Sequence, residues 1–323
     1  MASGSKTVIY AALGGNFAIA VTKFIAAAIT GSSAMFAEAV HSVVDTGNQV
    51  LLLWGLRQSQ RPPDAQFPLG RGKEVYFWSF IVAIMIFAVG SGVSLYEGVK
   101  HLRHPHPIEN VGISYVVLTL AMIFEGFAWA IALKGFRAVK GDRGYLEAVR
   151  AGKDPTMFVV LLEDSAALLG LMIAFIGITL GNWTGNPLFD GGASVVIGLI
   201  LGAVACLLAW ETKGLLIGEA AEPDVQARIR AIVTDRPGIK SVNELITVHM
   251  GPQNILVNLS VDFAPELSSD AVESAVTACN REIKAAIPDV RRVFIEAESW
   301  SAHRMQTGTN EDEAHSGQTE TEH

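Results

Sequence analysis

The sequence predicts an α-helical membrane protein: six transmembrane helices followed by a C-terminal cytoplasmic αββαβ domain. Half of the 323 residues are apolar and only 17% are charged, whereas soluble proteins carry about 25% charged residues. This composition excludes a disordered chain and argues against a soluble enzyme. Charge is also uneven, because residues 1–215 carry 15 basic and 14 acidic residues whereas residues 216–323 carry 9 and 18. We therefore expect a transport-type membrane domain over 1–215, a ferredoxin-like domain over 216–300 and a disordered acidic tail over 301–323.

Six stretches are long and apolar enough to cross a bilayer, which takes about 20 residues. They cover residues 8–29, 34–56, 75–99, 111–133, 156–180 and 189–212. Lys and Arg concentrate in the connections after the second and the fourth stretch, so the positive-inside rule predicts that both termini are cytoplasmic. No cleavage pattern of a signal peptide follows the first stretch, and no transit peptide precedes it. We expect a multi-pass protein of the inner membrane of a prokaryotic cell.

The rear of the chain alternates helix and strand patterns. A helix is predicted over 223–235, strands over 241–250 and 254–263, a helix over 268–286 that Ser268 and Ser269 can cap, and a strand over 290–296. This order predicts one small sheet with both helices on one face. The two cysteines, Cys206 and Cys279, lie far apart, which argues against a disulfide scaffold or a thiolate zinc site.

Ionisable side chains inside the expected spans cost several kcal/mol and mark candidate functional sites. His41 and Asp45 lie four residues apart, on one face of the second span. Imidazole and carboxylate ligands suit zinc and other first-row metals. Glu163 and Asp164 of the fifth span can complete the site, although neighbouring residues point about 100° apart around a helix. A histidine that only bonds between helices is the alternative, and three nearby acids argue against it.

Four further polar residues lie inside the spans. Glu38, Glu125 and Asn16 are candidates for a proton relay or for support around the metal ligands. Glu125 could equally bond a neighbouring helix, and Asn16 could simply join two helices. We expect Lys23 to snorkel toward the membrane surface.

The second span, 37-AEAVHSVVDTGNQ-49, the loop 64-DAQFPLGRGKE-74 and the αββαβ pattern resemble the cation diffusion facilitators over about residues 7–298. The fifth span, 161-LLEDSAALLG-170, resembles the branch that includes the vertebrate mitochondrial zinc transporter. The resemblance implies a metal site with two residues from the second span and two from the fifth. Its positions correspond to His41, Asp45, Asp164 and Val160. Valine cannot bind metal, so Glu163 is the natural substitute.

The resemblance also implies a homodimer. In the family, a lysine at the position of Lys73 can join a charge cluster at the dimer interface, with Glu211 or Glu219 as its partner here. Phe67 and Arg71 stand where many members carry loop histidines, so we expect no metal there. Asn243, Glu296 and Glu298, with His249 nearby, stand at the strand ends that bind zinc in several members. We expect a metal-free dimerisation domain.

These observations predict a proton-coupled antiporter that exports a divalent cation, zinc first and Mn²⁺, Fe²⁺ or Co²⁺ otherwise, by alternating access. Metal and protons compete for the same deprotonated ligands. The alternative is a metal-gated channel or a metal sensor without proton coupling. No HExxH motif or nucleophile elbow points to an enzyme. The expected partners are the metal ion, protons, a second copy of the chain and the lipid bilayer; we expect no nucleic acid and no cofactor beyond the transported cation.

Overall fold

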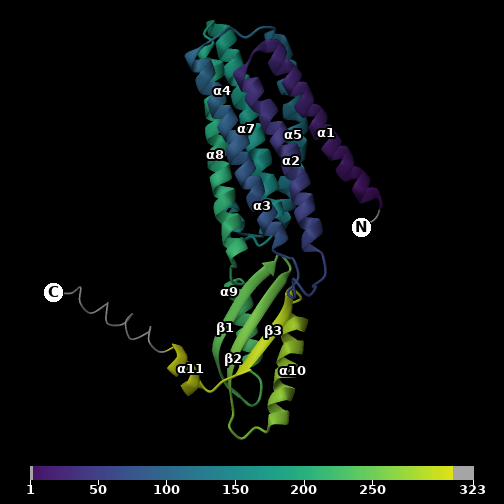
Figure 1. The fold of residues 1–323 in the computed structure, drawn as a ribbon, viewed down its shortest axis with the longest axis vertical. Helices are drawn as coiled ribbons and strands as arrows, with labels where there is room; N and C mark the ends of the chain where they lie inside the picture. The colour runs from purple at the N-terminus through teal and green to yellow at the C-terminus, as the bar shows by residue number, and fades with distance from the viewer. Residues whose placement is uncertain (1–2, 308–323) are drawn as a thin grey trace, which may run out of the picture. The chain divides into compact units, whose positions relative to one another are not determined.

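The computed structural model describes residues 3–307 and the side chains of residues 16–305. The chain divides into two compact units, Met1–Leu216 and Ile217–His323. In the first unit, long helices run side by side (Figure 1). They are α1 (Ser3–Thr30), α2 (Ser33–Ser59), a third span built from α3 (Glu74–Met85), the π-helical η1 (Ile86–Ser91) and α4 (Gly92–Arg103), then α5 (Val111–Lys140), α7 (Pro155–Thr184) and α8 (Leu188–Ile217).

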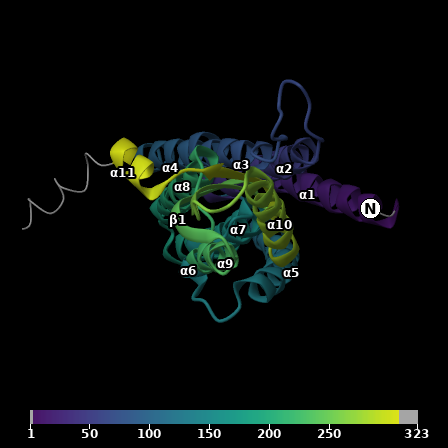
Figure 2. The same ribbon diagram turned by 90° about the horizontal axis from the view of Figure 1, so that it is seen from below.

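These helices confirm the predicted six-span fold. Four helical segments are long and apolar enough to cross a membrane by themselves: Glu74–Arg103, Val111–Lys140, Pro155–Thr184 and Leu188–Ile217. In α1 the described apolar part is Asn16–Thr30, and the amino-terminal end of this helix splays away from its neighbours in both views (Figure 2). The second helix is less apolar because its polar residues lower its hydropathy. Several helices outrun the predicted spans, since polar residues continue them, and a short helix, α6 (Tyr145–Ala151), was not predicted.

Small residues let the third and sixth spans approach closely. A Cβ added at Gly98 would lie 2.8 Å from the backbone nitrogen of Val195, and one added at Gly198 would lie 2.9 Å from that of Leu95. The Ser91 hydroxyl donates a hydrogen bond of 2.7 Å to the Gly198 carbonyl. Close backbone approach and interhelical hydrogen bonds are the usual sources of helix association in lipid.

The turn between α1 and α2 sets where the second span begins. Gly31 has φ of +67°, a conformation that favours glycine. Ser32 then caps α2, because its hydroxyl accepts a hydrogen bond of 3.0 Å from the Met35 amide. This turn fixes the register of the polar residues that follow on α2.

The second unit has the predicted αββαβ order. Its elements are α9 (Pro223–Thr234), β1 (Ile239–Gly251), β2 (Asn254–Phe263), α10 (Ser269–Ala286), β3 (Val290–Ala297) and α11 (Trp300–Thr307). The sheet order is β1-β2-β3, with β1 antiparallel and β3 parallel to β2. The buried Ile229 of α9, Val257 of β2 and Cys279 of α10 share one core. Ser268 caps α10, as predicted, by accepting from the Ala271 amide.

The expectation of a disordered tail over 301–323 is wrong for its first residues, which form α11. The Ser299 hydroxyl accepts a bond of 3.2 Å from the Ala302 amide, and the His303 Nδ1 atom lies 3.0 Å from Glu298 Oε2. The Trp300 and His303 rings stack at 6.1 Å. A cap and two side-chain contacts order this turn, and neither produces the apolar periodicity from which helices are predicted. Residues 308–323 lie outside the described residues.

Candidate metal centre

A stripe of polar residues runs along the buried face of α2. Glu38, His41, Asp45 and Asn48 are spaced by three, four and three residues, so they share one side of the helix. Glu38 is fully buried, His41 and Asn48 are each 1% exposed, and the Asp45 side chain is 13% exposed. Such a stripe inside a membrane helix is costly unless its groups are paired or bind a ligand.

His41 and Asp45 form the predicted pair. The Nδ1 atom of His41 lies 3.3 Å from Oδ1 of Asp45. The two atoms are close without the alignment of a hydrogen bond, and among the described residues neither nitrogen of the buried imidazole has a hydrogen-bond partner. Buried polar atoms are normally satisfied, so this imidazole is positioned to donate its lone pair to an ion.

The two adjacent acids of α7 face different surroundings. Glu163 is 4% exposed, accepts a bond of 2.7 Å from Nδ2 of Asn48 and lies within hydrogen-bonding reach of Asp45. Asp164 is less buried, and the charges nearest to it are those of Glu163 and of Glu125 on α5. Against α2, the structure therefore places Glu163 rather than Asp164.

The predicted ligands are not gathered into one finished site. Within residues 3–307, no three His, Cys, Asp or Glu side chains stand together so that they could hold a metal ion as they are. His41 meets Asp45, and Asp45 meets Glu163, along the seam between α2 and α7. Val160, which the resemblance aligns with a ligand, is a partly buried member of the apolar core. Binding an ion with three or more of these side chains requires them to move.

The expectation that Lys23 snorkels is wrong. Its side chain is fully buried, with Nζ 3.1 Å from Oε2 of Glu38 and donating a bond of 2.7 Å to the Ser42 hydroxyl. The other oxygen of Glu38 rests against α7, where a Cβ added at Gly170 would lie 2.3 Å from it. Lys23 lies in mid-helix near an acid of the next span, so an ion pair is closer than either membrane surface. That neighbourhood was the signal available in the sequence, and Asn48 carried a similar one through its place on the stripe.

The remaining predicted residues lie farther from this pair. Nδ2 of Asn16 donates to Oε1 of Gln49 at 3.0 Å, so it joins α1 to α2. The partly buried Glu125 acts electrostatically on Glu38, Asp45 and both α7 acids. It therefore lies among the acids, where a relay would have to be.

The residues predicted for a dimer charge cluster have other contacts in this chain. The Lys73 Nζ atom donates to the Leu216 carbonyl at 3.3 Å. Nε of Arg150 lies 4.0 Å from Oε1 of Glu211. In the second unit, the Glu219 carbonyl accepts a bond of 2.9 Å from the His249 amide. The cluster itself remains a prediction, because its test needs the second copy.

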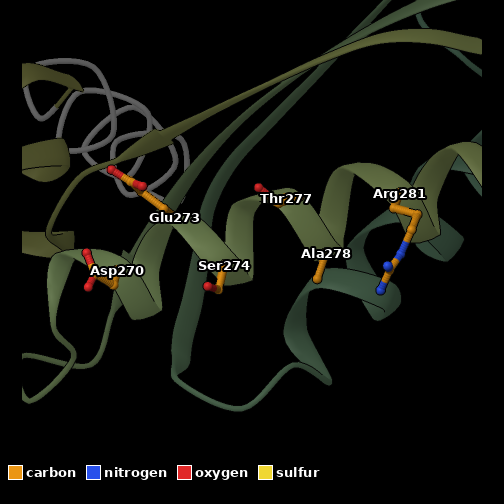
Figure 3. Close-up of a pocket in the computed structure, with 6 residues that line it drawn as sticks. All are labelled: Asp270, Glu273, Ser274, Thr277, Ala278 and Arg281. Atoms are coloured by element: carbon orange, nitrogen blue, oxygen red, sulfur yellow. The ribbon is translucent and has the colours of Figure 1, made fainter.

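The second unit carries a polar hollow of about 430 Å³ along α10. Figure 3 shows that its lining side chains follow one another along a single helix. They are Asp270, Glu273, Ser274, Thr277, Ala278 and Arg281. Since one helix supplies all of them, the hollow is an open helix face rather than a cleft, and it contains none of the residues predicted to bind metal.

Two family models match the chain. The model of the cation efflux transmembrane domain matches residues 9–217, and the model of the cytoplasmic domain of cation efflux proteins matches residues 221–300. The chain belongs to the cation efflux family. This confirms the resemblance to the cation diffusion facilitators and the predicted multi-pass fold. The family consists of transporters, so the prediction that the chain is not an enzyme is confirmed as well.

Curated relatives agree with this assignment. The Xenopus laevis protein named "Proton-coupled zinc antiporter SLC30A9, mitochondrial" is 36% identical over 89% of this chain and 51% of its own length. The Homo sapiens protein of that name is 35% identical over 75% of this chain and 43% of its own length. The chain thus spans about half the length of these relatives. "Cation-efflux pump FieF" of Klebsiella pneumoniae is 25% identical over 80% of this chain and 83% of its own length.

A solved structure also matches, over the second unit's size of fold. A nickel form of the MamM CTD aligns with 24% of this chain and 98% of its own, at 23% identity and a TM-score of 0.23.

Proposed function

We propose that the chain exports a divalent first-row transition-metal ion, with zinc as the preferred ion, in exchange for protons. The observation that carries this proposal is the His41–Asp45 pair. It is buried in a membrane helix, its Nδ1 and Oδ1 atoms lie 3.3 Å apart, and neither imidazole nitrogen has a hydrogen-bond partner among the described residues. One nitrogen and one carboxylate ligand suit zinc and its neighbours in the first row.

Proton exchange follows from the acids around this pair. Asp45 and Glu163 lie within hydrogen-bonding reach of each other, so without metal the two carboxylates are expected to share a proton. A divalent ion that binds them displaces that proton, because metal ligands must be deprotonated. If the loaded states rearrange and the empty charged state does not, proton entry drives metal export by alternating access.

The proposed ligands are His41, Asp45 and the α7 acids. Glu163 is supported by its position against Asp45, and Asp164 by its match to the family motif. We assign Glu38, Glu125 and Asn16 to the surroundings: Glu38 as the partner of Lys23, Glu125 as the candidate proton relay and Asn16 as a link between helices. With Glu163 in place of a second nitrogen ligand, the site is rich in oxygen, which weakens its discrimination against Mn²⁺.

The relatives support the finer parts of this proposal by their names, which specify zinc and proton coupling for the Xenopus laevis and Homo sapiens proteins. Those names also place the relatives in mitochondria. For this chain we propose a cell inner membrane with both termini in the cytoplasm, on the distribution of Lys and Arg. We further propose a homodimer, with Lys73 and either Glu211 or Glu219 in its charge cluster.

Metal-driven proton movement in sealed vesicles tests the function. The purified chain is reconstituted with a pH-sensitive dye inside, and Zn²⁺, Mn²⁺, Co²⁺, Fe²⁺ and Cd²⁺ are added in turn. A pH change that Asp45→Ala abolishes is the expected result, and the responding metals identify the substrate. Metal entry without a pH change would instead support a metal-gated channel, and no entry of any metal would favour a sensor.

The two α7 acids are separated in the same assay. If both are ligands, Glu163→Ala and Asp164→Ala each abolish exchange. If only the acid that lies against α2 is needed, Asp164→Ala retains it. Thermal unfolding of each detergent-solubilised variant shows whether a lost activity reflects lost folding.

A further inference from the structure

A second polar site lies at the end of the first unit where α1 turns into α2. A pocket of about 260 Å³ is enclosed there by this turn, by the last turns of α4 and by the loop that follows α4. Three histidines line it: His101, His104 and His106. No role for these residues follows from the central site, since they lie on other elements.

His101 is the buried member of this group. It lies in the last turn of α4 and is 4% exposed. Its Nε2 atom is buried and has no hydrogen-bond partner among the described residues. The charged atom printed nearest to it is Oδ2 of Asp190, at 3.9 Å. An unsatisfied nitrogen beside a carboxylate favours a cation.

Asp190 supplies negative charge there without being free to move. It is fully buried and accepts hydrogen bonds from the Ser32 hydroxyl at 2.6 Å, from the Ser33 amide at 2.6 Å and hydroxyl at 3.0 Å, and from the Ala34 amide at 3.4 Å. Its oxygens are therefore occupied by donors at the start of α2. It can attract an ion to His101 while the ion's direct ligands come from elsewhere.

His106 brings a second imidazole to the first. The two ring centroids are 4.3 Å apart, in an edge-to-face arrangement. His106 also rests against the α1–α2 turn, because a Cβ added at Gly31 would lie 3.4 Å from its Cε1 atom. It stands between Pro105 and Pro107, whose rings restrict the loop backbone. Two imidazoles are thus held together before any ligand binds.

Further ligands stand at the rim of the pocket. Glu97 is one helical turn before His101, and its Oε1 atom lies 3.1 Å from Nζ of the exposed Lys100. His104 is exposed on the loop. Because no three such side chains in the described chain are already at metal-holding positions, the exposed loop residues would close around an ion that His101 binds first.

We propose that His101 and His106, with Glu97 and His104 as the remaining protein ligands, bind a divalent first-row transition-metal ion. Imidazole nitrogen favours zinc, cobalt, nickel and copper over magnesium or calcium. His41 lies eight residues along α2 from Ser33, which is about 12 Å of helix, so this site is separate from the central pair. In the orientation of the proposed function, on which this placement rests, the pocket opens on the side to which metal is exported.

Cobalt binding to the purified full chain in detergent tests the site, since the visible spectrum of Co²⁺ reports nitrogen ligands. Asp45→Ala serves as the background that disables the central site. We expect it to retain one bound Co²⁺, and His101→Gln and His106→Gln in that background each to weaken binding at least about tenfold. Zn²⁺ is expected to displace the Co²⁺. His303→Gln, in the other unit, is the matched control and should leave binding unchanged.

His106 is exposed, so its substitution tests the ligand without disturbing the buried packing around His101. The proposal is overturned if the Asp45→Ala protein binds no Co²⁺, or if binding in it survives both histidine substitutions unchanged. Failure of the proposed function looks different: the wild type would then bind no more Co²⁺ than Asp45→Ala, or would move no protons, while the pocket would still bind.

Discussion

The two halves of the polar stripe on α2 have opposite solutions to the same problem. In one half, Glu38 meets a permanent cation, because Nζ of Lys23 lies 3.1 Å from its carboxylate and both side chains are fully buried. In the other half, His41 and Asp45 lie 3.3 Å apart, and the imidazole nitrogens have no hydrogen-bond partner among the described residues. The difference teaches that burial alone does not mark a binding site. A ligand site is the half whose charge is not already balanced from within.

Removing the internal cation should have the largest effect on stability. Lys23→Met leaves the Glu38 carboxylate buried without its partner, which typically costs about 3–5 kcal/mol. The free energy of unfolding of the full chain in mixed micelles measures this. Glu38→Gln combined with Lys23→Met should recover most of the loss.

A surface pair of the same length provides the control for that experiment. Nζ of Lys100 also lies 3.1 Å from its acid, Glu97, but it is 57% exposed. Lys100→Met should therefore change the free energy of unfolding by no more than about 1 kcal/mol. Equal losses for the buried and the exposed pair would contradict the assignment of Lys23 as an internal counter-ion.

Crowding the paired half against α7 should have the next largest effect. Gly170→Ala places a Cβ 2.3 Å from Oε1 of Glu38, so the carboxylate must shift away from its present position. We expect a loss of about 1–3 kcal/mol, typical of overpacked sites. Gly47→Ala is the control on α2, since nothing lies within 4 Å of its added Cβ; there, alanine should be neutral or stabilising. A Gly170→Ala chain as stable as wild type would show that the seam yields.

Adding a ligand sharpens the unpaired half. Val160→His supplies a second nitrogen one turn from Asp164, which should favour zinc over manganese by about tenfold, or about 1.4 kcal/mol. Competition between the two metals in the vesicle assay measures the ratio. An unchanged ratio would mean that position 160 does not face the ion.

The smallest effect is expected far from the stripe, at Glu298. The hydrogen bond from the Ser260 hydroxyl, with help from His303, holds the pKa of the Glu298 carboxyl below its usual value. A depressed pKa stabilises the folded state above the ordinary value of 4.5, and that contribution is lost as the pH falls through the lower folded value. The α11 helix should therefore loosen in acid. Fluorescence of Trp300, taken as the difference between wild type and Trp300→Phe, follows it.

Glu298→Gln provides the comparison for that titration. It removes the ionisable group while preserving an oxygen that accepts hydrogen bonds, so the acid-dependent change in Trp300 fluorescence should disappear. If the change persists in Glu298→Gln, another group controls the docking of α11.

Much of the fold was predictable because each element has its own local signal. The six apolar stretches and the alternating pattern of the C-terminal unit depend on neighbours in sequence, and α7 begins at Pro155, one residue from the predicted start. The pairing of His41 with Asp45 was predictable for the same reason, since both lie on one helix.

Contacts between helices were harder to predict. Lys23 and Glu38 belong to different helices, and whether a mid-span lysine reaches a surface or an acid depends on how α1 turns about its axis. The same holds for the choice between Glu163 and Asp164, which differ by about 100° of rotation. The helix α11 depends on a cap and on ring stacking, which leave no periodic pattern.

The carboxylate of Asp190 also constrains how this bundle can move. It joins the start of α8 to the first residues of α2 through four hydrogen bonds, and bonds to a charged group contribute about 1.5–3 kcal/mol each. Pulling these two helix ends apart would break them all inside a water-poor interior. Any motion that opens the central pair to one side and then the other is therefore expected to carry these ends of α2 and α8 as one rigid body. The sliding surface is then the seam with α7, where Gly170 presents a smooth backbone to Glu38.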